Sequence, residues 1–164
     1  MIKGYQLVAF FLCLYHQLTR FVNLPNNDKV KTLTSAYWTK EMTGLPAWLK
    51  PYLMNKPETI EDFPFGADVS VFKVKGKMFA TLAWGQDKTY YWMNLKCDPD
   101  EALALRDIFD AVIPGYHMNK QHWNTVILNG SIPQGEIERM IDSSFQLVVS
   151  KMTKKDQKSI LVHL

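Results

Sequence analysis

The side chains best suited to chemistry lie together in residues 114–124, whose sequence is PGYHMNKQHWN. Its two histidines could ligate a metal ion, but structural zinc sites use a fuller set of Cys and His ligands, so we predict no metal here. A small-molecule pocket is one interpretation, and its lining would be Tyr116, His117, Asn119, Trp123 and Asn124. The other interpretation is structural, with these residues forming hydrogen bonds that fix an irregular connector between strands.

A second group of candidates consists of lysines around the tip of a predicted β-hairpin. Lys73, Lys75 and Lys77 occupy alternating positions, so we expect them to point to one side of the ribbon, a geometry suited to phosphate groups. Three side chains in a later predicted turn could reach phosphate or base edges: Lys120, Gln121 and His122. The alternative is that the hairpin lysines form a solvated edge that discourages strand aggregation.

The sequence contains no motif typical of catalysis. There is no Gly-rich phosphate loop, nucleophile elbow or paired-carboxylate motif. Cys97 precedes a predicted helix, whose dipole favours a thiolate, but Asp98 and Asp100 oppose one, so we predict a buried, inert thiol. We therefore predict a binding protein without a cofactor, and an unassigned enzyme is the alternative.

Alternating β-branched and aromatic residues predict the strands that position these groups. Residues 69–75 and 78–84 form a predicted hairpin with Gly76-Lys77 at its turn, and residues 89–96 supply a third strand. Residues 123–128 alternate again and predict a fourth strand. Before the hairpin, we expect Phe63 and Phe65 to plug one end of the core.

Helical spacing and capping residues predict the remaining elements. A short helix is predicted at residues 47–54, and Asp98-Pro99-Asp100-Glu101 is an N-cap pattern that begins a helix ending near Phe109. Its predicted apolar stripe is Leu105, Ile108, Phe109 and Val112. The last long helix spans about residues 133–152, with one apolar face formed by Ile137, Met140, Ile141, Phe145 and Val148. The fold class is therefore α+β, a two-layer sandwich with helices on one face of an antiparallel sheet.

Charge and composition divide the 164 residues into three predicted parts. Residues 1–41 hold five of the 19 Lys and Arg residues and two of the 16 acids, so residues 42–164 carry 14 of each and are neutral overall. We interpret residues 1–41 as an N-terminal extension, residues 42–152 as the domain, and residues 153–164 as a basic, solvated C-terminal tail. The extension could dock on the domain, bind a partner protein, or lie upstream of a true start at Met42.

Cysteine usage and hydropathy indicate the cellular setting. Cys13 and Cys97 are too few to form a disulfide framework, which favours reduced thiols and a cytoplasmic location. The apolar run at residues 7–15 is shorter than a membrane span, and no small-residue cleavage site follows it. We therefore expect neither a membrane association nor secretion, and the oligomeric state stays open.

Several short motifs, taken together and in order, resemble the MmcQ/YjbR family of small bacterial proteins. They are KPETIEDFPFG at 56–66, VFKV at 71–74, GKMFA at 76–80, NLKCDP at 94–99, PGYHMNK at 114–120 and HWNT at 122–125. The resemblance covers about residues 42–152. It implies a fold similar to that of the bacterial frataxin CyaY, and a role in binding DNA through wing-like elements. The frataxin fold does not by itself imply iron handling, because function depends on the site.

The residues and the resemblance together lead to one expected function with alternatives. We expect a DNA-binding protein that makes mainly phosphate contacts through the lysines named above, with little base readout. The neutral overall charge of residues 42–164 weighs against this expectation, because DNA-binding domains usually carry a basic excess or a strong basic patch. The alternatives are a small-molecule site around His117 and Trp123, or a partner-binding adaptor that uses residues 1–41.

Overall fold

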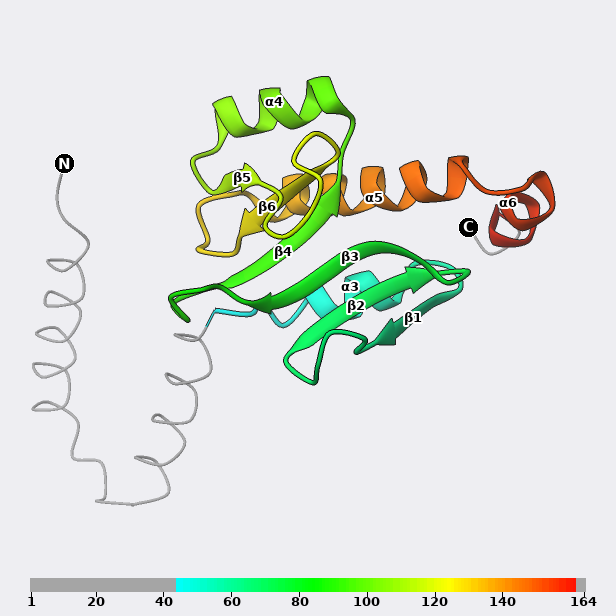
Figure 1. Cartoon of the computed structure of the whole chain (residues 1–164), viewed down its shortest axis with the longest axis horizontal. Helices are drawn as coiled ribbons and strands as arrows, with labels where there is room; N and C mark the ends of the chain where they lie inside the picture. The colour runs from blue at the N-terminus through cyan, green and yellow to red at the C-terminus, as the bar shows by residue number, and fades with distance from the viewer. Residues whose placement is uncertain (1–43, 162–164) are drawn as a thin grey trace, which may run out of the picture. The chain divides into compact units, whose positions relative to one another are not determined.

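One antiparallel sheet organises the part of the chain that the computed structural model describes, residues 44–161. Its strand order is β1-β2-β3-β4-β6-β5 (Figure 1). The strands are β1 (Thr59–Asp62), β2 (Val69–Val74), β3 (Lys77–Trp84), β4 (Tyr91–Lys96), β5 (Val112–Pro114) and β6 (Trp123–Ile127). The four strands predicted from the sequence are present, and the sheet gains β1 and β5 as its two edges. The predicted extension at residues 1–41 lies outside the described residues.

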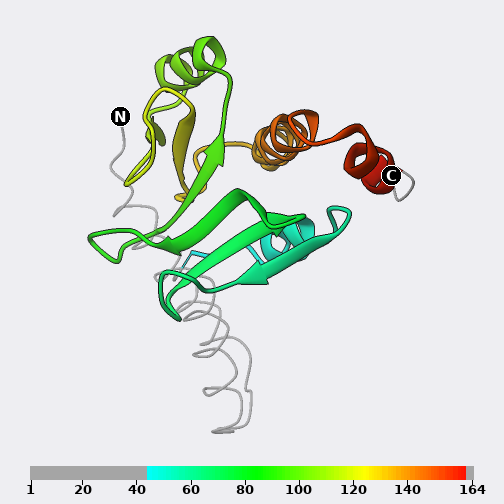
Figure 2. The same ribbon diagram turned by 45° about the vertical axis from the view of Figure 1, so that its right-hand side comes forward.

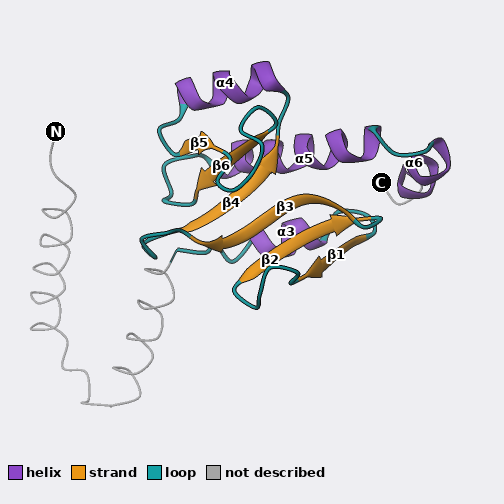
Figure 3. Cartoon of the chain, viewed as in Figure 1, coloured by secondary structure: helices purple, strands orange, loops and turns teal. Residues whose placement is uncertain are grey.

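Within residues 44–161, four helices accompany the sheet. They are drawn in purple in Figure 3. They are α3 (Leu49–Met54), α4 (Pro99–Ile108), α5 (Gln134–Ser150) and α6 (Lys154–Leu161). The cap predicted for α4 is confirmed, because the Asp98 carboxylate accepts a hydrogen bond of 3.0 Å from the backbone N–H of Asp100. None of these helices is long and apolar enough to cross a bilayer.

A single hydrophobic cluster joins the helices to one face of the sheet. The predicted apolar face of α5 is buried in full, and α3 and α4 add Leu49, Leu53, Ala102 and Leu105 to the same cluster. Tyr52 of α3 also donates a hydrogen bond of 3.0 Å to Asp142 of α5. The predicted α+β fold with helices on one face is therefore confirmed.

Two local predictions are wrong. Ile108 of α4 is 68% exposed, because the helix ends there and only its Ala102 and Leu105 face reaches the core. Phe63 and Phe65 do not plug the core; they lie in the loop after β1 and are 46% and 64% exposed. The sequence did not reveal the short edge strand β1, and the loop that follows this strand, residues 63–68, is exposed throughout.

The segment beginning at residue 153 also differs from the predicted solvated tail. Residues 154–161 form α6, and Ile160 of this helix is fully buried in the core cluster. Ser159 donates a hydrogen bond of 2.6 Å to Glu58, at the start of β1. The lysines of the segment, Lys154, Lys155 and Lys158, are exposed as predicted. The core therefore extends beyond the predicted boundary at residue 152.

Candidate anion-binding site

The hairpin lysines do not lie on one side of the ribbon, contrary to the prediction. The turn consists of Lys75 and Gly76, which both have positive φ, and Val74 pairs with Lys77 across it. Paired residues share a face, so Lys77 lies on the helix side of the sheet with the buried Val74. Lys73 pairs with Met78 and lies on the opposite face. Side chains alternate between the two faces along a single strand, but the two-residue turn interrupts this alternation between Lys73 and Lys77.

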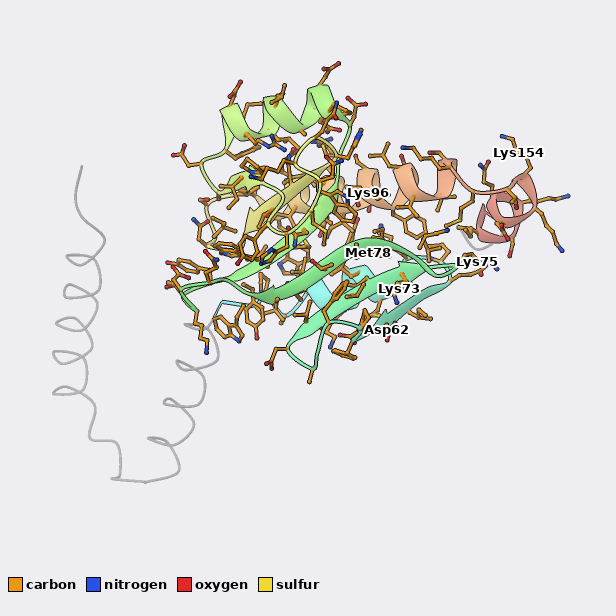
Figure 4. The ribbon with its side chains drawn as sticks, in the orientation of Figure 1. Asp62, Lys73, Lys75, Met78, Lys96 and Lys154 are labelled. Atoms are coloured by element: carbon orange, nitrogen blue, oxygen red, sulfur yellow. The ribbon has the colours of Figure 1, made fainter. Side chains whose placement is uncertain are left out.

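Two of the three hairpin lysines have their charge matched by a carboxylate. Lys73 lies 2.5 Å from the Asp62 carboxylate (Figure 4), and this contact is the main reason that the pKa of Asp62 is lowered. Lys75 forms an ion pair with Glu58, which also accepts the hydrogen bond from Ser159 of α6. Lys77 has no such partner within residues 44–161.

Beyond the point where Ala80 pairs with Leu95, β3 and β4 separate, and Figure 2 shows β4 rising away from the β2–β3 hairpin. The β2–β3 pairing shifts register between Phe72 and Lys73, which leaves Phe79 without a partner residue on β2. The fully buried Ser144 of α5 bridges the two strands, donating a hydrogen bond of 2.6 Å to the Phe79 carbonyl and accepting one of 2.8 Å from the Lys96 N–H. The helix thus satisfies backbone groups that strand pairing leaves free.

A cavity of about 270 Å³ lies at this end of the sheet, between the hairpin, the end of β4 and the last turn of α5. We call it the basic pocket, and its lining includes Lys75, Lys77, Lys96, Val148, Lys151 and Met152. Thr153 and Asp156 complete the lining at the start of α6, where the Thr153 hydroxyl donates a hydrogen bond of 2.7 Å to the Asp156 carboxylate.

The basic pocket carries positive charge that is not neutralised. Within residues 44–161, none of Lys77, Lys96 and Lys151 forms an ion pair. Lys96 is half-buried at the end of β4 (Figure 4), and its ammonium lies 5.5 Å from the centre of the Trp123 ring. Burial lowers the pKa of Lys96, and the charges of Lys151 and Lys77 lower it further. An anion in the pocket would offset the repulsion between these lysines and favour the charged form of Lys96.

The residues predicted to line a small-molecule pocket do not converge on one. Asn124 is buried on the helix side, where it accepts a hydrogen bond of 2.8 Å from Arg106 and donates one of 3.3 Å to the Ala102 carbonyl. The cavity beside it is about 10 Å³, close to the minimum for one water molecule. Trp123 is buried on the other face, and His117 and Asn119 are exposed. The small-molecule site expected around these residues therefore stays a prediction.

The same segment has the contacts of a structural connector. The Gly115 N–H donates a hydrogen bond of 2.9 Å to the Trp123 carbonyl, and the Tyr116 N–H donates one of 2.8 Å to the Thr125 hydroxyl. The Tyr116 ring packs edge-on against Trp92, with 5.4 Å between the ring centres. These contacts fix the path of the chain between β5 and β6.

The predicted contact tip of this connector is exposed but separate from the basic pocket. Lys120, Gln121 and His122 are all exposed, and none of them lines the pocket. The Lys120 carbonyl accepts a hydrogen bond of 2.5 Å from Arg106, and the Gln121 N–H donates one of 2.9 Å to the Asn119 side chain. Their proposed contact with nucleic acid stays a prediction.

Cys97 is buried, and it is a free cysteine. Burial raises the pKa of its thiol to about 12, and the nearby Glu101 carboxylate adds to the shift. The thiol is therefore neutral near pH 7 and is a poor nucleophile, as the sequence predicted. No cluster of three or more His, Cys, Asp or Glu side chains suited to a metal ion occurs within residues 44–161.

The fold and the site define a small α+β domain with a basic pocket at one end of its sheet. Residues 54–147 match the family model described as YjbR. The chain is also 32% identical to the uncharacterised protein YjbR of Escherichia coli K12 over 116 residues, which cover 71% of this chain and 96% of that protein. The chain therefore belongs to the YjbR family, as its motifs indicated.

Other relatives and solved structures agree with this assignment. The uncharacterised protein YbdF of Escherichia coli O157:H7 is 37% identical over 98 residues, which cover 60% of this chain and 79% of that protein. The crystal structure of Deinococcus radiodurans protein DR2400, described with domain DUF419, matches with a TM-score of 0.65 and 33% identity, over 72% of this chain and 88% of that one. A Pseudomonas syringae protein matches with a TM-score of 0.56 and 33% identity, over 63% and 98%.

Proposed function

We propose that this protein binds DNA through phosphate groups held by Lys77, Lys96 and Lys151, without catalysing a reaction. The observation that supports the proposal most strongly is the meeting of three lysines without ion pairs around one cavity. Lysine ammonium groups are common ligands of phosphate, and such contacts position nucleic acid without reading its sequence. A cytoplasmic location goes with this proposal.

The proposed contact surface differs from the one expected from the sequence, because it does not use Lys73 and Lys75. Lys73 and Lys75 would have to break ion pairs with Asp62 and Glu58 before binding phosphate, which reduces the net gain from each contact. Lys77, Lys96 and Lys151 have no such pairs to break. The neutral overall charge of residues 42–164 is compatible with a local basic site, because carboxylates elsewhere on the domain offset its charge in the total.

A titration of labelled duplex DNA at low and moderate salt tests the proposal. Each phosphate contact contributes about −0.9 to the slope of log K against log salt, so three contacts predict a slope between about −2 and −3. Lys151→Ala should weaken binding and make the slope shallower by about 0.9. Lys154→Ala is the matched control, since this neighbouring lysine is also exposed but does not line the pocket.

Two results would contradict the proposal. One is the absence of DNA binding by the full chain at low salt. The other is binding that Lys154→Ala or Lys120→Ala weakens as much as Lys151→Ala does, because the pocket would then have no special part in it.

A further inference from the structure

We propose that the basic pocket selects a phosphomonoester dianion, the group found at a phosphorylated strand end or on a free nucleotide, over the monoanionic phosphodiesters inside a strand. This inference rests on the same three lysines as the proposed DNA binding, but it names the chemical group that they recognise. It follows from the charge of the pocket, from its shape and from the environment of Lys96.

The charge of the pocket matches a dianion. Lys77, Lys96 and Lys151 each contribute one positive charge, and the Asp156 carboxylate removes one. Lys75 adds nothing to the balance because Glu58 is paired with it. The remaining charge is two positive, whereas a phosphodiester carries a single negative charge. A phosphomonoester carries about −1.5 to −2 at pH 7.

The shape of the pocket suits a group that projects from its carrier. Its three unpaired lysines come from separate parts of the fold, since Lys77 lies at the start of β3, Lys96 at the end of β4 and Lys151 just after α5. A volume of about 270 Å³ is at the lower end of the range for small-molecule sites. A phosphodiester inside a duplex is flanked by sugars on both sides, so it can contact the exposed lysines at the surface but enters a hollow less readily than a terminal group. A terminal phosphate is attached on one side and can enter.

Apolar side chains in the same pocket provide a contact surface for the nucleoside to which the phosphate is attached. Val148 of α5 is buried and Met152 is half-buried, and both line the cavity beside the lysines. Contact with a ribose or a base would remove this apolar surface from water. A nucleoside phosphate therefore fits the lining better than inorganic phosphate alone.

The environment of Lys96 adds an independent argument. Its pKa is lowered by burial and by the charges of Lys151 and Lys77, so the ammonium groups of these lysines repel that of Lys96. A ligand with two negative charges relieves this repulsion more than a ligand with one.

The experiment compares one duplex in two forms, with a 5′-phosphate and with a 5′-hydroxyl, in competition binding to the full-length protein. We expect the phosphorylated form to bind roughly tenfold more tightly, the effect of one additional charge-assisted contact. Adenosine 5′-monophosphate and inorganic phosphate are tested as separate competitors. Displacement by the nucleotide would identify a free ligand as the source of the phosphate, and preference restricted to the duplex would identify a strand end.

Variants locate the preference in the pocket. Lys151→Ala and Lys77→Gln alter exposed side chains, so both proteins should fold, and each should reduce the preference for the 5′-phosphate to less than about threefold. Asp156→Asn should strengthen binding of the phosphorylated duplex, because it removes the carboxylate from the lining. Lys154→Ala should leave the preference unchanged.

The outcomes separate this inference from the proposed DNA binding. Equal affinity for the two duplexes, with binding that still depends on Lys151, would overturn the dianion inference and leave DNA binding standing. Displaceable binding of adenosine 5′-monophosphate without any binding of duplex DNA would support the dianion inference and overturn DNA binding. A preference for the 5′-phosphate that survives in both Lys151→Ala and Lys77→Gln would overturn the inference.

Discussion

At the scale of single residues, Ser144 supplies hydrogen bonds to backbone groups of β3 and β4 where the two strands separate. Its hydroxyl bonds to the Phe79 carbonyl and the Lys96 N–H, and the side chain is fully buried. Ser144→Ala leaves both backbone groups without a partner, so we expect a loss of about 2–4 kcal/mol in the free energy of unfolding. Urea denaturation measures this loss. Ser143→Ala, one position earlier on the same helix, is the control and should change the free energy by less than about 0.5 kcal/mol.

The thiol of Cys97 provides a second prediction. Burial raises its pKa to about 12, so the folded protein should contain almost no thiolate near pH 9, where an exposed thiol is half ionised. In a Cys13→Ser background, iodoacetamide should label Cys97 slowly in the folded protein and rapidly in urea. Mass spectrometry follows the labelling over time. Rapid labelling of the folded protein would show that the thiol is accessible and ionised.

Individual site residues were predictable from the sequence only in part. Lys77 and Lys96 begin and end neighbouring antiparallel strands, so their placement at the same end of the sheet follows from the strand order. Lys151 could not be placed, because the direction of α5 across the sheet depends on tertiary packing. The ion pairs of Lys73 and Lys75 also depend on tertiary structure, since their partners Asp62 and Glu58 lie on the edge strand β1 or just before it.

At the scale of elements, Gly115 is required by the junction between β5 and β6. A Cβ atom there would lie 2.8 Å from both the Cβ and the carbonyl oxygen of Trp123. We therefore expect Gly115→Ala to destabilise the protein by about 1–3 kcal/mol, because the strand backbone must move. Thermal unfolding measures the change. Gly135→Ala is the matched control. A Cβ atom at Gly135, in α5, would meet no atom within 4 Å, so this substitution should stabilise the protein by up to about 1 kcal/mol.

The docking of α6 is a second prediction at this scale. Ile160 is fully buried, so Ile160→Ala should lower the free energy of unfolding by about 2–4 kcal/mol. Denaturant unfolding measures this effect, with the exposed Lys155→Ala as the control. Equal stability of the two variants would mean that α6 is not part of the core.

The elements that the sequence predicted well are the long ones. The cap of α4, the apolar face of α5 and the central strands carry strong local patterns, and all three predictions were confirmed. β1 and β5 have four and three residues, which is too short for a periodic pattern to develop. α6 was missed because its five polar residues LysLysAspGlnLys resemble a solvated tail, and Ile160 is the residue of this helix that joins the core cluster.

At the scale of the whole molecule, a domain that is neutral overall brings three lysines without ion pairs together around one cavity. Ion pairs match several lysines and arginines along α3, the hairpin and α5, while Lys77, Lys96 and Lys151 surround the cavity without partners. The divergence of β3 from β4 exposes the last turn of α5 between them and so creates the cavity. Net charge read from the sequence could not reveal this site, because it depends on which charges pair.

The most direct test of the account is a two-dimensional ¹⁵N–¹H NMR titration of the full-length protein with short duplex DNA at low salt. The largest shifts should map to the backbone amides of Lys77, Lys96 and residues 151–156, around the basic pocket. Small shifts are expected at Lys73 and at residues 120–122. Shifts concentrated at Lys73 or residues 120–122, with none around the pocket, would contradict the account.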